Sequence, residues 1–500
     1  MKVFTRIFSM CAIAFAFLLL SVNAQAEVYY ISPTGDDAAS GTTQETAWKT
    51  WKKAFSKETA CGDTILVLNG KFTVAENGSP RISGKTCTSS TPFIVKALNQ
   101  RKALIQGNGL TTTFTIVNSK HIKLHGLRIA NKDNAKGKSG GFVINISNSP
   151  YVTVQHGIFS YPNRYSNAHV LAFQKSPYGF AEGNEIYSFH RLGIYVYSSD
   201  YAVIRRNYCN ARDRADIKDG YASTEIKSGD SCVSIYTASY ATVENNISDG
   251  TMGKPYILQS SALSTSNRFF GNISIGSTKV SLSLEATNGT GPEKMPTNTV
   301  VKDHLAVTPV STGIQFRGTK NASCDHCTVI GGKNAFLLDT VKGYGDGIES
   351  GTITNSLALG KGGCSGFSVS RSIDSWLLNY NLSYSYSSVY DPALPHKNIR
   401  NAIVSNPNMG TCYAWVPDDS PLKKRAAGKT DPGARILYRY NKGSLTSTPL
   451  WNRTTGKFPH GAIIAGVNDK AGMSAFDVHT RLNINTKGCL FPKEYTVVAK

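Results

Sequence analysis

One segment of the sequence gathers charged side chains that could do acid–base or ion-binding chemistry. It lies between Cys209 and Cys232 and holds, in chain order, Arg212, Asp213, Arg214, Asp216, Lys218, Asp219, Glu225, Lys227 and Asp230. A disulfide between the two cysteines would restrain this loop at its base. Loops held by a rigid scaffold carry much of protein function, so the 210–231 loop is the first candidate for a site.

The residue types in and around this loop fit a reaction that starts by removing a proton. Lys227 could act as the base if neighbouring cations and burial lower the pKa of its ammonium group. Arginine can bind a carboxylate through two parallel hydrogen bonds, and a tyrosine or histidine can donate a proton to a leaving group. We therefore expect the catalytic residues to be Lys227, Arg212, Tyr236, His190 and Arg191, and the substrate-binding residues to be His169, Tyr197 and Arg214.

Metal binding is a weaker expectation. Four carboxylates, Asp213, Asp216, Asp219 and Asp230, could supply oxygen ligands to Ca²⁺, but their spacing matches no calcium loop, and aspartates among Arg and Lys also form solvated ion-pair networks. The cofactor is therefore either none or Ca²⁺. The sequence Cys324-Asp325-His326-Cys327 looks like half of a zinc or redox motif, but no second Cys-x-x-Cys accompanies it. We expect it to be structural.

A repeated phrase indicates how these residues are positioned: an apolar strand, a turn at Gly or Asn, and a second short apolar run. It occurs as SKHIKLHGLRI at 119–129, SPYVTVQHGIF at 149–159, SPYGFAEGNEI at 176–186, SDYAVIRRNYC at 199–209, SYATVENNISD at 239–249 and TSNRFFGNISI at 265–275. Aligned on Gly126, Gly157, Asn184, Asn207, Asn246 and Asn272, the steps are 31, 27, 23, 39 and 26 residues. Such a period is typical of a solenoid, whose coils bury their apolar sides against each other.

The turn residues and the tyrosines indicate which class of solenoid fold the chain adopts. Gly and Asn enter the left-handed region cheaply, and stacked Asn side chains can pass hydrogen bonds along the axis. An aromatic row is expected from Tyr151, Tyr178, Tyr201 and Tyr240, each six residues before a turn. Strands of four to six residues without crossover helices predict an all-β, right-handed parallel β-helix. This alignment also places Tyr197 and Tyr236 at equivalent positions of neighbouring strands.

The chain divides into four predicted parts. Residues 1–26 have the charged start, apolar stretch and small-residue end of a secretory signal peptide. Residues 27–118 are expected to form an N-terminal cap and the first coils, with Trp48, Trp51 and Phe55 on the apolar side of a short capping helix. Residues 119–404 would form the β-helix, and 405–500 a loop-rich C-terminal cap or appended module. No segment after the signal is apolar enough to span a membrane.

Cysteine content and charge bear on compartment and partner. Nine cysteines follow the signal, and in a secreted or periplasmic protein we expect the pairs Cys61–Cys87 and Cys209–Cys232, with Cys412 and Cys489 holding the C-terminal part. Without Lys2 and Arg6 of the signal, 52 Lys and Arg face 33 Asp and Glu, a surplus of 19. This surplus favours an acidic polysaccharide or another anionic surface polymer as partner. Nucleic acid is not expected, because no nucleic-acid-binding motif is present. We expect a monomer.

The segment YYISPTGDD, the Trp-rich helix and GDTILVLNGKFT resemble the start of secreted right-handed β-helix proteins, a superfamily with pectate-lyase-like and alginate-lyase-like enzymes. This resemblance implies the fold and a carbohydrate context. The sequence lacks the clustered aspartates of calcium-dependent pectate lyases, the paired aspartates of polygalacturonase-like hydrolases and the Asp-Pro-His-Asp phrase of mannuronan epimerases. We expect a lyase that cleaves an acidic polysaccharide by β-elimination. The alternatives are a non-catalytic adhesin or glycan-binding solenoid, and a hydrolase with paired carboxylates such as Asp213 and Asp230.

Overall fold

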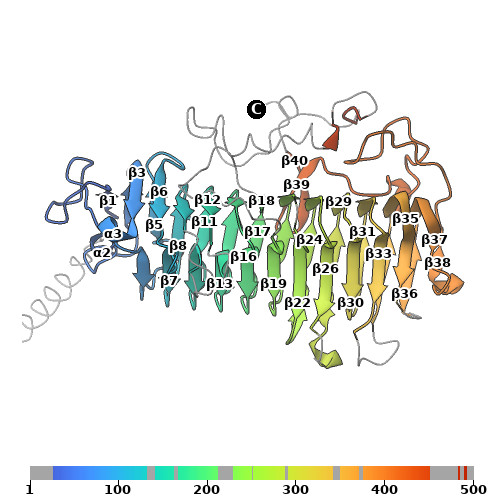
Figure 1. The fold of residues 1–500 in the computed structure, drawn as a ribbon, viewed down its shortest axis with the longest axis horizontal. Helices are drawn as coiled ribbons and strands as arrows, with labels where there is room; N and C mark the ends of the chain where they lie inside the picture. Colours follow the sequence, from blue (N-terminus) through green and yellow to red (C-terminus); the bar gives the residue numbers. More distant parts are fainter. Residues whose placement is uncertain are drawn as a thin grey trace, which may run out of the picture.

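The computed structural model describes residues 26–131, 141–162, 167–211, 229–250, 252–287, 291–341, 349–370, 375–450, 482–484 and 489–492. The signal peptide predicted for 1–26 lies almost wholly outside these residues. In the described part, short strands follow one another around coils that stack along one axis (Figure 1). Every strand pair along the stack is parallel, and each strand pairs with its equivalents in the coils before and after it. The prediction of a parallel β-helix is confirmed.

The coils present three faces. The first face consists of β1 (Val28–Ile31), β2 (Thr64–Val67), β5 (Phe93–Ala97), β8 (Ile122–His125), β11 (Thr153–Gln155), β14 (Phe180–Glu182), β17 (Val203–Arg205), β20 (Thr242–Glu244), β24 (Arg268–Phe270), β28 (Val300–Lys302), β31 (Ala322–Asp325), β34 (Gly351–Thr354), β36 (Trp376–Asn379) and β38 (Ile399–Arg400). The second face follows it after a tight turn. It consists of β3 (Gly70–Thr73), β6 (Ala103–Gln106), β9 (Arg128–Ala130), β12 (Ile158–Ser160), β15 (Glu185–Tyr187), β18 (Tyr208–Asn210), β21 (Ile247–Asp249), β25 (Ile273–Ile275), β29 (Leu305–Val307), β32 (Thr328–Ile330) and the first halves of β35 (Leu357–Val369) and β37 (Leu382–Tyr390).

The third face carries the longer strands. It consists of β4 (Arg81–Ser83), β7 (Phe114–Val117), β10 (Ile144–Ser147), β13 (His169–Gln174), β16 (Leu192–Tyr197), β19 (Ser231–Tyr236), β22 (Tyr256–Ser260), β26 (Val280–Ala286), β30 (Thr312–Arg317), β33 (Asn334–Asp339) and the second halves of β35 and β37. Two-residue strands β23 (Ser264–Thr265) and β27 (Pro296–Thr297) pair beside it, and a one-turn helix η1 (Pro292–Lys294) precedes β27. One continuous core of inward-facing side chains runs inside the three faces.

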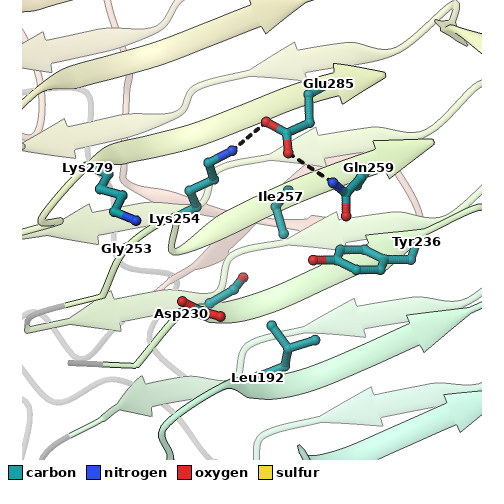
Figure 2. A pocket seen from close by; sticks show the side chains of 10 residues that line it. Leu192, Asp230, Tyr236, Gly253, Lys254, Ile257, Gln259, Lys279 and Glu285 are labelled. Carbon is teal, nitrogen blue, oxygen red and sulfur yellow. Dashed lines mark hydrogen bonds and ion pairs between the residues drawn. The ribbon is translucent and has the colours of Figure 1, made fainter. Parts of the chain in front are cut away.

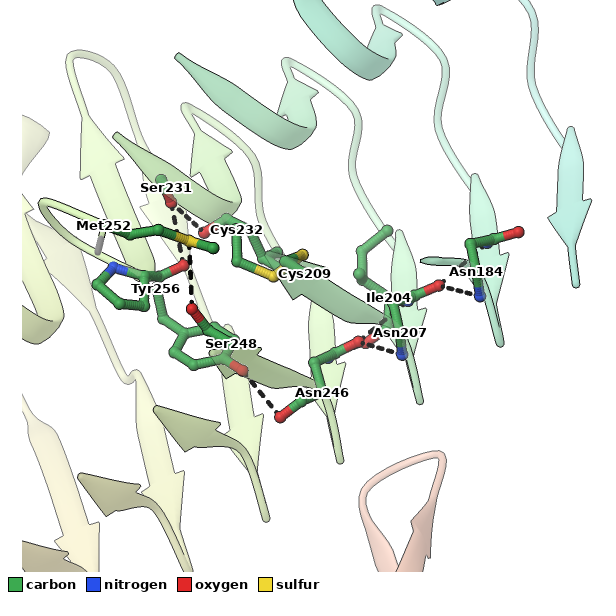
Figure 3. The surroundings of a disulfide bond; sticks show 12 residues. Asn184, Ile204, Asn207, Cys209, Ser231, Cys232, Asn246, Ser248, Met252 and Tyr256 are labelled. Carbon is green, nitrogen blue, oxygen red and sulfur yellow. Dashed lines mark hydrogen bonds between the residues drawn. A yellow bond between two sulfur atoms is a disulfide. The ribbon is translucent and has the colours of Figure 1, made fainter. Parts of the chain in front are cut away.

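The turn between the first and second faces is sealed by the predicted asparagine row. Each backbone N–H and side-chain amide of Asn184, Asn207 and Asn246 donates to the Oδ1 atom of the next asparagine along the axis, ending at Asn272, all at 3.0 Å (Figure 3). The same side-chain amides also donate to a carbonyl of the preceding coil. These asparagines are fully buried, so the row satisfies polar groups that the stack removes from water.

Two details of the predicted register are wrong. The left-handed residue is the one before the asparagine, where Gly183, Arg206 and Asn245 have φ values of 64°, 52° and 53°. The asparagines therefore serve hydrogen bonding rather than backbone freedom. At the start of the row the pairing of His125 with Gln155 aligns Leu127, not Gly126, with Gly157.

The tyrosine row is confirmed. Between the third and first faces Tyr151, Tyr178, Tyr201 and Tyr240 stack with ring centroids 4.5, 4.9 and 4.8 Å apart and nearly parallel planes. His121 extends the stack by one ring at 4.6 Å. Each ring is partly exposed, and stacking on neighbours removes the ring faces from water.

The ends of the stack and the disulfides follow the sequence closely. At the N-terminal end the short helix α2 (Trp51–Ala54) begins after Thr50, which accepts a hydrogen bond from the Lys53 N–H at 3.2 Å, and it buries Trp51 against Phe72 and Phe114. A second short helix, α3 (Val74–Asn77), follows β3. The predicted pairs Cys61–Cys87 and Cys209–Cys232 form, and Cys412 pairs with Cys489. Cys324 and Cys327 also form a disulfide, which is buried in the core.

The described part of 405–450 lies along the outside of the second face. After η2 (His396–Asn398) and β38 the chain leaves the last coil and passes η3 (Ala427–Lys429). It then forms the hairpin of β39 (Tyr438–Asn441) and β40 (Ser444–Pro449) beside the middle coils (Figure 1). Apolar side chains that point outward from the second face, including Ile273 and Leu305, pack against Trp415 and Leu437 of this segment. In the described chain no helix is both long and apolar enough to cross a membrane.

Candidate functional site

The outer side of the third face offers side chains for chemistry because β-strand residues alternate. Pairing sets Leu171, Ile194 and Val233 in one inward row. The outward row that ends these strands is polar. In coil order it reads Gln174, Tyr197, Tyr236, Gln259, Glu285, Arg317 and Asp339. A polymer lying along the axis would therefore meet one polar side chain of this row per coil.

A hollow of about 180 Å³ opens on this face at the coils of β16 to β26 (Figure 2). It is lined by Leu192, Asp230, Ser231, Tyr236, Gly253, Lys254, Ile257, Gln259, Lys279 and Glu285. The Tyr236 ring lies on one side with its hydroxyl directed across the hollow, and the two lysines reach in from the opposite side. The hollow thus combines a phenol, two cations, two carboxylates and an amide.

Hydrogen bonds fix the carboxylates differently. Glu285 is nearly buried. Its Oε2 atom forms the ion pair with Lys254 and accepts from the Ser283 hydroxyl at 2.8 Å, while its Oε1 atom accepts from the Gln259 amide at 3.3 Å. Asp230 is held through its backbone, whose N–H donates to the carbonyls of His190 and Arg191 and whose carbonyl accepts from the Lys254 N–H at 2.7 Å. Lys254 is therefore tied to both acidic residues, whereas no ion pair or hydrogen bond of the Lys279 ammonium is seen among the described residues.

An aromatic and cationic cluster adjoins the hollow. Ring centroids of His169 and Tyr195 are 4.5 Å apart, and those of Tyr195 and Tyr236 are 5.3 Å apart. Arg191 lies close enough for its charge to act on both His169 and Tyr236, and its guanidinium donates to the Asn167 side chain. The cluster therefore links the strand ends of three successive coils to the Tyr236 hydroxyl.

Burial sets the protonation states in this cluster. It lowers the pKa of the His169 imidazole to about 3, and the Arg191 charge adds to that shift. It raises the pKa of the Tyr195 hydroxyl to about 12, helped by Tyr236. Burial also raises the pKa of Tyr236, an effect that the Arg191 charge only partly offsets. At neutral pH the cluster thus offers a neutral imidazole and protonated phenols beside a cation.

Three buried polar atoms of this region lack a hydrogen-bond partner within the described residues: the Nδ1 atom of His169, the Nε atom of Arg191 and the hydroxyl of Ser234. Buried polar atoms are rarely left without partners. Groups left open in this way can take up a ligand or water.

The structure brings five of the predicted residues together. Tyr236 and Asp230 line the hollow, and Arg191 and His169 belong to the adjoining cluster. Tyr197 pairs with Tyr236 as predicted and is 37% exposed beside it. The His190 side chain points into solvent, and only its carbonyl takes part, by accepting from Asp230. Six further residues of the predicted site lie outside the described residues: Lys227, Arg212, Arg214, Asp213, Asp216 and Asp219.

The sequence analysis did not identify five residues in or beside the hollow: Tyr195, Lys254, Lys279, Gln259 and Glu285. The repeat could have shown Gln259 and Glu285, because they share the outward row of Tyr236. However, the connections from the third face to the first lengthen in these coils: the left-handed corner residue comes four residues after the end of β19, six after β22 and twelve after β26. Alignment on the asparagines alone therefore misplaces the third-face strands. In the described chain no three or more His, Cys, Asp and Glu side chains cluster as a metal site.

Comparisons with known proteins give a likeness of fold. No family model matches the sequence, and no curated protein is significantly similar to it. Similar solved structures include a GH136 lacto-N-biosidase from Eubacterium ramulus, with 11% identity over 75% of this chain and 67% of that one and a TM-score of 0.45. They also include the PL6 family alginate lyase AlyGC, with 12% identity, 82% and 56% coverage and a TM-score of 0.47.

A third similar structure is the pectate lyase Pel9A, with 12% identity over 87% of this chain and 95% of that one and a TM-score of 0.41. At 12% identity, the likeness to these two lyases is one of the β-helix fold. These three similar structures are two lyases and a glycosidase. The similarity of fold therefore does not indicate which reaction this protein would catalyse.

Proposed function

We propose that this protein is a secreted or periplasmic carbohydrate-active enzyme that cleaves an acidic polysaccharide by β-elimination on its third face. The observation that carries the proposal is that Tyr236 and Lys279 line one open hollow, with the Arg191 charge close to Tyr236 in the adjoining cluster. Four disulfides among the described residues favour an oxidising compartment.

β-Elimination needs three things, and the hollow supplies two of them. The carboxylate of a uronate unit must be neutralised so that the proton beside it becomes acidic, and Arg191 and Lys279 are cations able to do this. The glycosidic oxygen that leaves must receive a proton, and the Tyr236 hydroxyl is a protonated donor directed across the hollow. Breaking the C–O bond then leaves an unsaturated sugar at the new end.

The third requirement is a base. Lys254 is a poor candidate, because its side chain is already engaged by the Glu285 carboxylate. We retain Lys227 as the proposed base. It lies outside the described residues, three positions before Asp230, which lines the hollow.

A second function is favoured by one observation: Asp230 and Glu285 line the same hollow. Two carboxylates flanking a glycosidic bond are what a glycoside hydrolase uses. Against this, both oxygens of Glu285 are already engaged by other side chains. The third alternative is a solenoid that binds glycans without cleaving them.

One experiment separates these functions. The purified protein is incubated with pectate, alginate, glycosaminoglycans and neutral glucans, and the ultraviolet absorbance of unsaturated ends is followed together with reducing ends. We expect absorbance and reducing ends to rise together on one of the acidic polymers. Reducing ends without absorbance would mean hydrolysis, and binding without either would mean a non-catalytic protein.

A further inference from the structure

A second hollow, of about 310 Å³, lies apart from the one on the third face. It sits where the outside of the second face meets the turn 406–410 that follows the last coil. The buried side chains of Ile330 and Leu359 lie at its inner side, where they belong to the apolar core between the second face and the C-terminal segment. Its rim consists of Lys361 and Tyr384 on the β-helix and Asn406 and Tyr413 on the C-terminal segment.

The wall that the C-terminal segment provides is fixed in place. Met409 is only 6% exposed and packs in the core between this segment and the second face. The Cys412 N–H donates to the Met409 carbonyl at 2.9 Å, and Cys412 is disulfide-bonded to Cys489. The Asn408 N–H donates to the Asn406 side chain at 3.0 Å. The hollow is therefore preformed, which reduces the entropy lost when a ligand binds.

The rim chemistry suits one ring that is apolar on its face and polar at its edge. The Tyr384 ring is 38% exposed, and Asn406 offers an amide that both donates and accepts. The Lys361 ammonium lies 5.7 Å from the centroid of the Tyr413 ring, and among the described residues no carboxylate pairs with it. An ammonium held over a ring keeps its N–H donors available. The one ammonium group, that of Lys361, can pair with one carboxylate group of a ligand.

We propose that this hollow binds one acidic pyranose unit of a polysaccharide, at a distance from the reacting unit. The third-face hollow belongs to the coils of β16 to β26, whereas this one belongs to the coils of β32 to β37. At the usual strand spacing the centres of these two groups of coils lie roughly 21 Å apart along the axis. A polymer several units long could engage both, so this site would retain the polymer and leave the reaction chemistry unchanged. This second site rests on its own lining and does not depend on the reaction proposed above.

The test uses the full-length protein and calorimetric binding of three probes: an oligogalacturonate, an oligoalginate and a neutral xylo-oligosaccharide of equal length. The variants are Lys361→Gln and Tyr384→Ala, and the matched control is Lys320→Gln, an exposed lysine elsewhere on the helix. We expect the wild type to bind at least one acidic probe, each rim variant to weaken that binding at least tenfold, and Lys320→Gln to leave it unchanged.

Three results would overturn the proposal. The first is that both rim variants bind the acidic probes with wild-type affinity. The second is that the neutral probe binds as tightly as the acidic ones and that Lys361→Gln does not change its affinity. The third is that the wild type binds neither acidic probe. The outcome is independent of the proposed function. A protein that cleaves no polymer but loses acidic-probe binding with Lys361→Gln would refute the lyase and keep this site.

Discussion

The rings of Tyr195 and Tyr236 meet edge to face across neighbouring coils, with planes at 85° and centroids 5.3 Å apart. This contact holds the Tyr236 ring so that its hydroxyl projects across the hollow. Tyr195 is itself packed against His169, so the phenol that we assign as proton donor is positioned by two further rings rather than by a flexible loop.

Replacing Tyr236 with Phe should lower turnover by about 10²- to 10⁴-fold, the usual contribution of a general acid, and change KM little. Steady-state kinetics would measure this, with Tyr201→Phe on the exposed tyrosine stack as the control. Because burial raises the pKa of Tyr236, the wild type should keep its proton donor through neutral pH and lose activity only above about pH 10. Unchanged turnover in Tyr236→Phe would remove Tyr236 from the mechanism.

Replacing Lys227 with Ala should abolish cleavage and leave polymer binding and secretion largely intact, because losing a base removes an interaction of the transition state rather than of the fold. Lys218→Ala in the same loop is the matched control and should retain activity. Activity assays combined with a polymer pull-down would show the difference. Wild-type rates in Lys227→Ala would exclude it as the base.

The contact between Asp325 and His326 predicts that the attachment of the C-terminal segment to the β-helix depends on pH. Burial tends to raise the pKa of the Asp325 carboxyl, but hydrogen bonds from His326, Asn355 and Thr354 lower it to about 2. Burial tends to lower the pKa of the His326 imidazole, but Asp325, 2.9 Å away, raises it overall. The other ring nitrogen of His326 contacts the Thr430 hydroxyl of the C-terminal segment at 3.1 Å.

The stability from Asp325 is present above its unfolded pKa of about 3.9 and lost as the pH falls toward 2. That from His326 is full below its unfolded pKa of about 6.5 and lost as the pH rises through its higher folded value. His326→Gln should therefore destabilise the protein most between about pH 4 and 6.5, by on the order of 1 kcal/mol after solvent screening. Urea unfolding at pH 5.5 and 8.5 would measure this, with the exposed His396→Gln as control. An equal loss of unfolding free energy at both pH values would contradict the predicted pH dependence.

Replacing Asn207 with Ala should destabilise the β-helix by roughly 2–4 kcal/mol, because it leaves the buried N–H groups of Asn184 and the carbonyl of Ala181 without their partner. The exposed Asn69→Ala, outside the row, should change stability by less than about 0.5 kcal/mol. Denaturant unfolding of both variants is the measurement. Equal stabilities would mean that the row contributes little beyond its geometry.

The sequence was sufficient for the parts of the fold that repeat. The asparagine and tyrosine rows, the Cys209–Cys232 disulfide and the pairing of Tyr197 with Tyr236 follow from a fixed coil register, because each coil must match the next. The Cys324–Cys327 disulfide was not predicted, since a strand-like Cys-x-x-Cys gives no sign that a tight turn separates its cysteines.

The site was predictable only in part. Tyr236, Arg191 and His169 were found because they stand near a conspicuous charged loop. Lys279 and Glu285 lie two coils further on, where a longer connection shifts the apparent register. The packing of residues 405–450 on the second face could also not be predicted from the sequence. The outward Ile273 and Leu305 look in sequence like any core residue, and only the three-dimensional fold shows that they face the C-terminal segment.

The C-terminal segment makes the order of synthesis matter. Its Tyr440 N–H donates to the Asn245 side chain, and the Lys442 and Gly443 N–H groups donate to Glu244, across about two hundred positions of sequence. A bare solenoid can complete its coils one after another as the chain grows. Here the middle coils keep an apolar side and a buried glutamate uncovered until the 405–450 segment has been made. This segment thus covers, late in synthesis, a body whose strands can already have paired.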